Sequence, residues 1–320
     1  MAAATWTYSA PDGVYKSHEI SKNLLHVAIE EMKLLPFTTA VSGFGKGRGE
    51  TITLMHIKHV PEPLSAELEE STRIPIDQIE MDQRAITVVE MGRGIEHTHL
   101  FEQLSAFDVR NEIQKALKVQ MERCMDTAVA AAFKHTDVKV IFTPTSLTGG
   151  VWDTDGTPTT AATHNLTFDH MGVIADYMAG DLHIPPYKGD NYVSCWSRKP
   201  LRGLKSDPLW QAVHMYLRKG ELFFKGEVGM AEGIRCVEVH RENALSNSIG
   251  TGSITGEGLI FGDEAIARVE AEAPHLRLDA NFQGDFGRTK AVAWYGILKF
   301  ASIWATANDG EAKIVRWASA

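Results

Sequence analysis

Cysteine is scarce in this chain of 320 residues, and its placement excludes several structures. The three cysteines, Cys124, Cys195 and Cys236, are far apart and odd in number. They predict neither a disulfide framework nor a zinc site, and their number suits a reducing cytoplasm. The N-terminus MAAATWTYSA lacks the basic and apolar regions of a signal peptide. The longest apolar stretch, Ala291–Ala307, is interrupted by Lys299 and predicts a buried strand, so no membrane contact is expected.

Positive charge is also in short supply. The net charge is −9, and no cluster of lysine and arginine is dense enough for a nucleic-acid patch. The best candidates are Lys46–Arg48 and, further on, Lys199, Arg202 and Lys205. This composition argues against general nucleic-acid binding, but it is compatible with a protein that only encloses nucleic acid.

Motifs that carry chemistry are absent or lack the context they need. Gly43-x-Gly45-x-Gly47 precedes a strand and not a helix, and no Walker lysine or G-x-S-x-G elbow occurs. The turn Asp153-Thr-Asp155-Gly156 has His164 where a calcium loop needs glutamate. Ser194-Cys195 lies in a predicted strand with no base marked for it. We therefore expect no catalytic residues and no cofactor.

The best metal candidate is the pair His97-x-His99, with His56 and His59 across the base of a predicted hairpin. Metal-binding histidines usually come with a third ligand and a second shell, which the sequence does not supply. Histidines at a surface or interface are the favoured interpretation, and no metal is expected.

The most informative segment is a hairpin with a very long loop. Thr51–Lys58 alternates as a strand does, and the β-branched Ala85–Met91 is the natural return strand. Between Glu62 and Arg84 there are seven acids against two arginines, with prolines at 63 and 75. A compact domain rarely carries a loop of about 20 residues without a function, and we expect this one to lie on another copy of the chain. The candidate contact residues are Glu62, Glu67, Glu69, Glu70 and Arg73.

A long helix follows the hairpin. Ala106–Lys134 carries one apolar stripe and would span roughly 40 Å, so it is expected to act as the spine of the subunit. Further helices are predicted at Ser17–Leu35, Leu166–Asp181 and Asp207–Leu217. Strands are predicted at Asn191–Pro200, Leu222–His240, Leu259–Ala273, Thr289–Ala305 and Lys313–Ala318. Strands and helices do not alternate regularly, so the fold class is α+β.

A glycine-rich block within Leu222–His240 forms the second candidate site. Gly226, Gly229 and Gly233 suggest positive φ or close packing of the backbone. Glu227 is the charged residue inside this block, and we expect it to hold backbone N–H groups or a neighbouring arginine.

The order of these elements resembles that of the major capsid proteins of tailed bacteriophages with the Hong Kong 97-like fold, and most closely the N-four-like podophage family. The segments that carry the resemblance lie between about Gly49 and Arg268, and the Gly226-Glu227-Val228-Gly229 and Gly233-Ile234-Arg235 block is the most specific of them. The others are GETITLMHIKHVPEPLSAELEE, MDTAVAAAF, YVSCWSRKP, the helix start DPLW, LFFKGEVGMAEGIRCVEV and LIFGDEAIARVE.

The resemblance implies an N-terminal arm at 1–45, an extended hairpin loop at 46–100 and an axial domain at 166–273. It implies a peripheral domain with the spine helix at 101–165 and 274–320. It further implies self-assembly as hexamers and pentamers into an icosahedral shell around a double-stranded DNA genome, with no active site. Scaffolding, portal and decoration proteins are implied as partners, and the shell would be assembled in the cytoplasm of the infected bacterium.

Two other interpretations stay open at this point. Encapsulin compartments of cells share the fold, so fold alone does not decide the function. A metal-dependent hydrolase using His97 and His99, with the hairpin as a lid, is the alternative from a different class.

Overall fold

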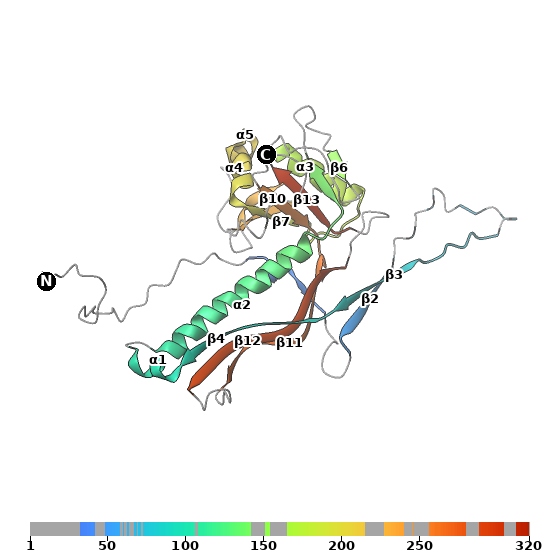
Figure 1. Ribbon diagram of the computed structural model, residues 1–320. Coiled ribbons are helices and arrows are strands. Elements are labelled where there is room, and N and C mark those ends of the chain that lie inside the picture. Colours follow the sequence, from blue (N-terminus) through green and yellow to red (C-terminus); the bar gives the residue numbers. More distant parts are fainter. Residues whose placement is uncertain are drawn as a thin grey trace, which may run out of the picture.

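The protein is elongated, with a compact body, a long two-layered wing and a thin hairpin arm (Figure 1). This computed structural model describes residues 33–41, 49–57, 60, 63, 67–68, 70–71, 73–105, 108–141, 151–153, 165–214, 227–239, 245, 256–279, 288–303 and 312–319. The helix expected over Ser17–Leu35 falls almost wholly outside these residues, and the glycine-rich segment Gly43-x-Gly45-x-Gly47 falls wholly outside them.

A mixed seven-stranded sheet forms the body. Its order is β6 (Val151–Asp153), β5 (Lys139–Ile141), β13 (Ile314–Ser319), β10 (Gly256–Phe261), β7 (Tyr192–Ser197), β9 (Ile234–Val239) and β8 (Glu227–Ala231). The pairs β7–β9 and β13–β5 are parallel, and the other neighbours are antiparallel.

Both faces of this sheet are covered, which explains why every residue of β7 and β10 is buried. On one face Trp196 and Trp317 pack in a core with α3 (Phe168–Gly180), α4 (Arg198–Ser206) and α5 (Pro208–His214). On the other face Phe261 packs against Phe133, at the end of the long helix α2, with ring centroids 4.8 Å apart.

A four-stranded sheet and α2 (Val109–Phe133) form the wing. The strand order is β1 (Thr39–Ala40), β11 (Ile266–Asp279), β12 (Thr289–Ser302) and β4 (Val89–Thr98). Alternate residues of β12 are buried, and Val292 and Trp294 form a cluster with Leu117 of α2. The helix therefore lies along one face of the sheet and stiffens it along its length (Figure 1).

Arg316 of β13 fastens the end of α2 to the body. Its guanidinium donates to the carbonyl of Lys134 at 2.9 Å and to the carboxylate of Glu257 at 2.6 Å. Arg316 and Glu257 are both buried and pair within the body, so the wing is joined to the body through the hydrogen bond from Arg316 to the carbonyl of Lys134.

The arm is the pair β2 (Thr51–Ile57) and β3 (Met81–Thr87), with an extended segment at 73–80 that leads into β3. The expected strand Thr51–Lys58 is confirmed in β2, but the return strand Ala85–Met91 is wrong in extent. Two strands lie there, β3 and β4. The strand is interrupted at Val88, because the chain pairs with β2 before this residue and with β12 after it. The sequence on both sides of Val88 is rich in β-branched residues and contains no glycine or proline, so it does not predict the change of pairing partner.

The spine helix is confirmed, with a later start than predicted. Asp108 is its N-cap and accepts from the backbone N–H of Asn111 at 3.1 Å. Ser105, just before it, is the C-cap of the separate short helix α1 (His99–Leu104). The segment Asn191–Pro200 is also only partly a strand, because α4 begins at Arg198 with Pro200 in its first turn, where proline is tolerated.

The strand pairing bears on the expected division into domains. β5 and β13 lie in segments assigned to the peripheral domain, yet both belong to the seven-stranded sheet. Conversely, β11 begins at Ile266, inside the segment assigned to the axial domain, and belongs to the four-stranded sheet. Sheet membership thus divides the chain at different residues from those expected.

Candidate interaction surfaces

The described residues of the outer arm, between positions 60 and 80, are all exposed. Of the five acidic and basic candidates, Glu67, Glu70 and Arg73 are exposed, whereas Glu62 and Glu69 lie outside the described residues. The same segment exposes large apolar side chains, with Ile76 at 74% and Met55 at 76%. The others are Ile57, Leu68, Ile74, Ile79 and Met81.

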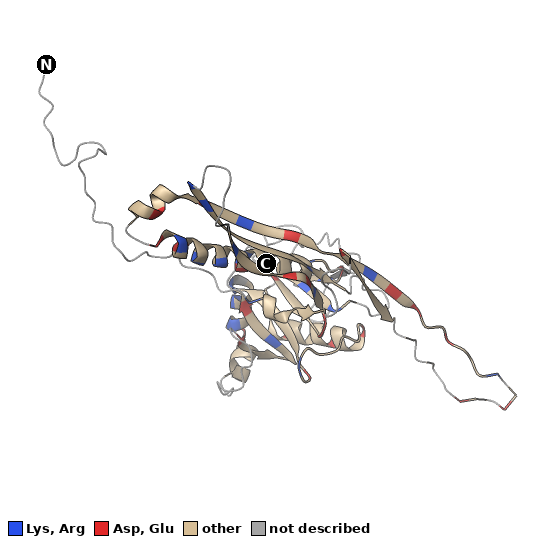
Figure 2. Cartoon of the chain, turned by 90° about the horizontal axis from the view of Figure 1, so that it is seen from below, with Lys and Arg blue, Asp and Glu red and all other residues tan. Residues whose placement is uncertain are grey.

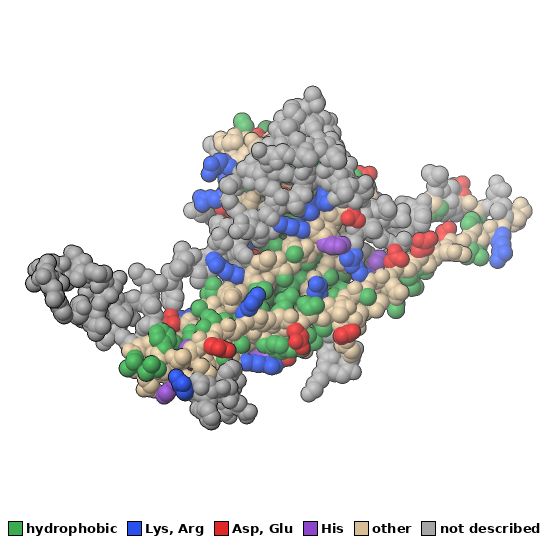
Figure 3. All heavy atoms as spheres, viewed as in Figure 1, with side chains coloured by type: hydrophobic (Ala, Val, Ile, Leu, Met, Phe, Trp, Pro, Cys, Tyr) green, Lys and Arg blue, Asp and Glu red, His purple; other side chains and the backbone are tan. Residues whose placement is uncertain are grey.

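This mixture of exposed apolar and acidic side chains is visible along the arm in Figure 3, and Figure 2 marks the acidic positions on the cartoon. Isolated apolar residues on a surface need no explanation, but a run of this kind marks a contact surface. The arm cannot cover itself, because it stands away from the body.

Among the described residues of the arm, those at its base pack on the wing. Ile52 and Leu54 of β2 pack with Ile86 of β3 on Ala267 and Val269 of the wing. The hydroxyls of Thr51 and Thr87 lie 2.9 Å apart across the same pair of strands. The arm is therefore positioned by the wing and is free to reach another molecule at its outer end.

The glycine-rich block forms the hairpin β8–β9 at the edge of the body. Glu232 and Gly233 have positive φ, 44° and 74°, as a two-residue hairpin turn requires. Gly229 is in β8, where a Cβ would overlap the imidazole of His214. The close packing expected here is thus present at Gly229, and the positive φ at Gly233. Gly226 lies outside the described residues.

Glu227 has the arginine partner that we expected, and the partner belongs to its own chain. Its carboxylate accepts from the guanidinium of Arg235 at 2.9 Å, and both residues are buried.

The residues considered for catalysis are not arranged for it. Cys195 and Cys236 are buried, and burial raises the pKa of the Cys236 thiol to about 12 and raises that of Cys195 further. Ser194 donates its hydroxyl proton to the carbonyl of Arg235 at 3.1 Å. The side chains of Cys195, Cys236 and Ser194 are thus buried within the packed sheet. Of the Asp153 turn, only Asp153 lies within the described residues.

The histidine pair is split between two environments at the far end of the wing. His97, on β4, is buried, whereas His99 begins α1 and is exposed. The described residues contain no group of three or more histidine, cysteine, aspartate or glutamate side chains placed to hold a metal. His59 is outside the described residues.

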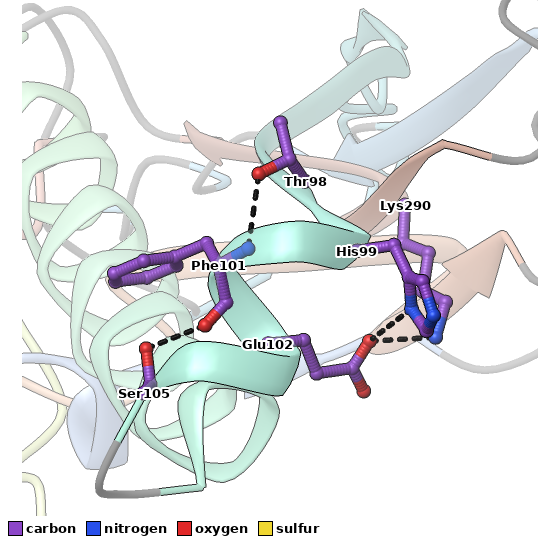
Figure 4. Close-up of polar contacts among 6 residues, drawn as sticks. All are labelled: Thr98, His99, Phe101, Glu102, Ser105 and Lys290. Carbon is purple, nitrogen blue, oxygen red and sulfur yellow. Dashed lines mark hydrogen bonds and ion pairs between the residues drawn. The ribbon is translucent and has the colours of Figure 1, made fainter.

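Figure 4 shows the polar contacts of this end of the wing. Thr98 caps α1 by accepting from the N–H of Phe101 at 3.2 Å. Glu102 accepts from Lys290 of β12 at 2.6 Å, and His99 lies 3.7 Å from the same carboxylate oxygen. The hydrogen bond from Lys290 lowers the pKa of Glu102, so α1 is tied to β12 by a charged contact.

Among the described helices, none has the length and apolar content needed to cross a bilayer.

No protein-family model matches the chain, and no curated protein matches it either. Solved structures do match over the whole chain. The capsid asymmetric unit of cyanophage Pam1 superposes with a TM-score of 0.72 at 14% identity, covering 100% of both chains. The head of Helicobacter pylori bacteriophage KHP40 gives 0.67 at 12% identity, covering 98% of this chain and 99% of that one. The capsid of Ralstonia phage GP4 gives 0.66 at 15% identity and covers 99% of each.

Identities this low establish the fold and nothing finer. The chain has the Hong Kong 97-like fold of tailed-phage capsid subunits, which confirms the expected α+β class.

Proposed function

We propose, from a fold shared end to end with tailed-phage capsid subunits, that this chain is a major capsid protein. Many copies would assemble as hexamers and pentamers into an icosahedral shell around the double-stranded DNA genome of a tailed bacteriophage. The observation that carries the proposal is coverage of both chains from end to end, arm and wing included. The N-four-like podophage family stays the predicted subfamily.

In this proposal the arm makes a head-to-tail contact with the next copy. Rings need heterologous contacts of this type, in which one surface meets a different surface of its neighbour. The exposed apolar residues of the arm supply buried area, and Glu67 and Glu70, with Glu62 and Glu69, meet basic groups of the neighbour. Each exposed ion pair contributes only about 0–1 kcal/mol, but the contact repeats in every subunit.

The seven-stranded body would be the axial domain, and the four-stranded wing with α2 the peripheral domain. This assigns β5 and β13 to the axial domain and all of β11 to the peripheral domain. The β8–β9 hairpin, with Gly226, Gly229, Gly233 and the Glu227–Arg235 pair, would support packing near the local symmetry axis.

Scaffolding and portal proteins, and a decoration protein, are the proposed partners. The shell would form in the cytoplasm of the infected bacterium and remain in the virion. Encapsulin compartments are the second candidate because the fold is the same, and the contents of the particle separate the two: DNA in one, cargo protein in the other. The hydrolase alternative requires a third ligand beside His97 and His99, and the described residues hold no group of three side chains placed to bind a metal.

The first experiment is electron microscopy of the expressed protein, alone and with the products of neighbouring genes. Hexamer-sized or larger closed particles are expected. Deleting Leu64–Gln78 should leave a folded monomer, by circular dichroism and thermal denaturation, that does not assemble. Normal shells from this deletion would contradict the role of the arm.

Point variants make the test sharper. Ile76→Asn and Ile79→Asn remove exposed apolar side chains from the arm and should lower assembly yield. Leu209→Asn is the matched control, because Leu209 is 51% exposed on α5, away from the arm. Equal yields from arm and control variants would show that exposed apolar residues of the arm contribute nothing particular.

A further inference from the structure

A buried histidine without a polar partner lies at the wing tip, which is α1 with the adjoining ends of β4, β11 and β12. The side chain of His97, on β4, is only 7% exposed, and both of its ring nitrogens are shut off from solvent. Within the described residues neither nitrogen makes a hydrogen bond. Burying an unpaired polar group costs free energy, and burying an unpaired charge costs far more. The site therefore accommodates the neutral ring and disfavours the protonated one.

The charged groups that face His97 would not compensate a positive charge on it. A pocket of about 200 Å³ at the wing tip is lined by His97, by Glu102 of α1, by Arg110 of α2 and by Lys290 of β12. Lys290 lies directly opposite His97 in the pairing of β4 with β12, and like charges at opposite positions are destabilising. Glu102 already accepts from Lys290 at 2.6 Å, and β11 contributes the apolar Leu278. A protonated His97 would thus face two cations and a carboxylate that is already paired.

The helix α1, which carries Glu102, is only lightly attached to the wing. None of its side chains is buried. Its large apolar side chains are exposed: Leu100, Phe101 and Leu104. Figure 4 shows Phe101 directed away from the contact between Glu102 and Lys290, so the polar side of the helix faces the wing. An element with few buried contacts opens at a lower free energy than the core of a protein, and α1 is therefore able to open locally.

We infer that the wing tip is an acid-sensitive switch, in which protonation of His97 releases α1 from β12 and admits water to the buried ring. In the closed tip the ring is neutral. In the open tip it lies in water, where a histidine takes up a proton at about pH 6.5. Because the open state binds the proton, the closed state has its full stability above about pH 6.5 and loses stability as the pH falls below that value.

The neighbouring titratable groups, Glu102 and His99, do not produce this response. The hydrogen bond from Lys290 lowers the pKa of Glu102, so this carboxylate stays charged between pH 7.5 and 5.5 and keeps its contact. His99 lies 3.7 Å from the same carboxylate, and its protonation strengthens the attachment of α1. A weakening of the tip by acid is therefore specific to the buried His97.

The test is amide hydrogen exchange of the unassembled subunit at pH 7.5 and 5.5, at constant ionic strength and corrected for the intrinsic exchange rates. Protection of residues 97–104 should fall by about tenfold, which is the change expected when one histidine titrates in the open state alone. Strand β10 of the body reports any general loss of stability and should lose less protection than the tip. His97→Phe keeps an aromatic ring that cannot be protonated, so it should abolish the fall.

His99→Gln is the matched control, because it removes an exposed histidine of the same segment and should keep or enlarge the fall. His97→Leu repeats the test if the phenylalanine is not accommodated, and circular dichroism checks the fold of each variant. Unchanged protection of the tip in the parent, an equal fall in the parent and the His97 variants, or loss of the fall in His99→Gln would overturn the inference. If neither His97 variant folds, the parent and His99→Gln decide it. The measurement uses subunits alone, so its outcome does not depend on whether the protein forms the proposed shell.

Discussion

At the scale of single residues, burial decides what each polar group can do. Arg235 and Glu227 are both buried and face each other at 2.9 Å, so each compensates the charge of the other. The sequence pointed to backbone N–H groups or an arginine as the partner of Glu227, because a carboxylate within a glycine-rich block needs donors. It could not point to burial of His97, because that depends on β4 pairing with β12, far away in the chain.

Glu227→Gln should destabilise the subunit by about 3 kcal/mol, because it leaves the buried Arg235 without its counter-charge. The measurement is denaturant unfolding of the unassembled subunit. Lys115→Gln is the control; it breaks an exposed pair with Glu112 and should change stability by less than about 0.5 kcal/mol. Unchanged stability in Glu227→Gln would indicate that the glycine-rich block is an ordinary surface hairpin. A destabilised variant with normal assembly would confine its role to folding.

The three thiols should differ sharply in reactivity. Cys124 is exposed on α2, whereas burial raises the pKa of Cys236 to about 12 and raises that of Cys195 as well. An aromatic disulfide reagent at pH 8 should therefore modify one thiol per native subunit and three after denaturation. Rapid native labelling of two or three thiols would contradict the packing of β7 against β9.

The two buried thiols, Cys195 and Cys236, predict a dependence of stability on alkaline pH. Their folded pKa values lie above the ordinary thiol value of about 8.5, so the unfolded chain loses these protons first. Their contribution to stability is complete below about pH 8.5 and declines as the pH rises from there towards the folded values. A Cys195→Ala, Cys236→Ala double variant should show a smaller decline between pH 8.5 and 10.

At the scale of elements, strong local periodicity was enough to predict the spine helix and β2. The prediction failed where a boundary depended on a distant partner. Nothing local separates β3 from β4, since only their partners, β2 and β12, differ. Similarly, β10 and β11 were predicted as one strand, although they belong to different sheets. The candidate surface on the arm was predictable, because a segment rich in prolines and acidic residues is unsuited to packing against its own subunit.

Contact between α5 and the β8–β9 hairpin gives an element-scale prediction. His214 donates from Nδ1 to the carbonyl of Trp210 at 2.8 Å, and its Nε2 accepts from the N–H of Met230 at 3.2 Å. A methyl group on residue 229 would displace this imidazole, so Gly229→Ala should cost about 1–3 kcal/mol by denaturant unfolding.

The matched control is Gly180→Ala, at the exposed end of α3, where a Cβ meets no atom within 4 Å. Alanine is the better helix former, so this variant should be unchanged or up to about 1 kcal/mol more stable. If both variants behave alike, the glycine at 229 is not required by the contact with His214.

At the scale of the whole molecule, the shape and charge of the chain suit the proposed shell subunit better than a protein that binds free nucleic acid. The arm and wing extend away from the body, so much of their surface can only be covered by other molecules (Figures 1 and 2). The charge is acidic overall, and the basic helix α4 is already partly engaged. Lys205 donates to Glu238 at 2.7 Å, and Arg198 lies 3.7 Å from the same carboxylate.

The unassembled subunit should therefore bind duplex DNA poorly, even if the shell encloses it. The net charge of −9 opposes approach to a polyanion, and the cations of α4 that pair with Glu238 are not available to phosphates. Binding through six or more phosphates would weaken by roughly 10³-fold between 50 and 200 mM salt, and we expect too few contacts for such a slope. A gel-shift titration at physiological salt should show no complex at micromolar protein. Micromolar or tighter binding with a steep salt dependence would mean that the protein holds DNA by contact. Weak binding is what the proposed shell requires, because the genome must slide along its inner surface during filling and release.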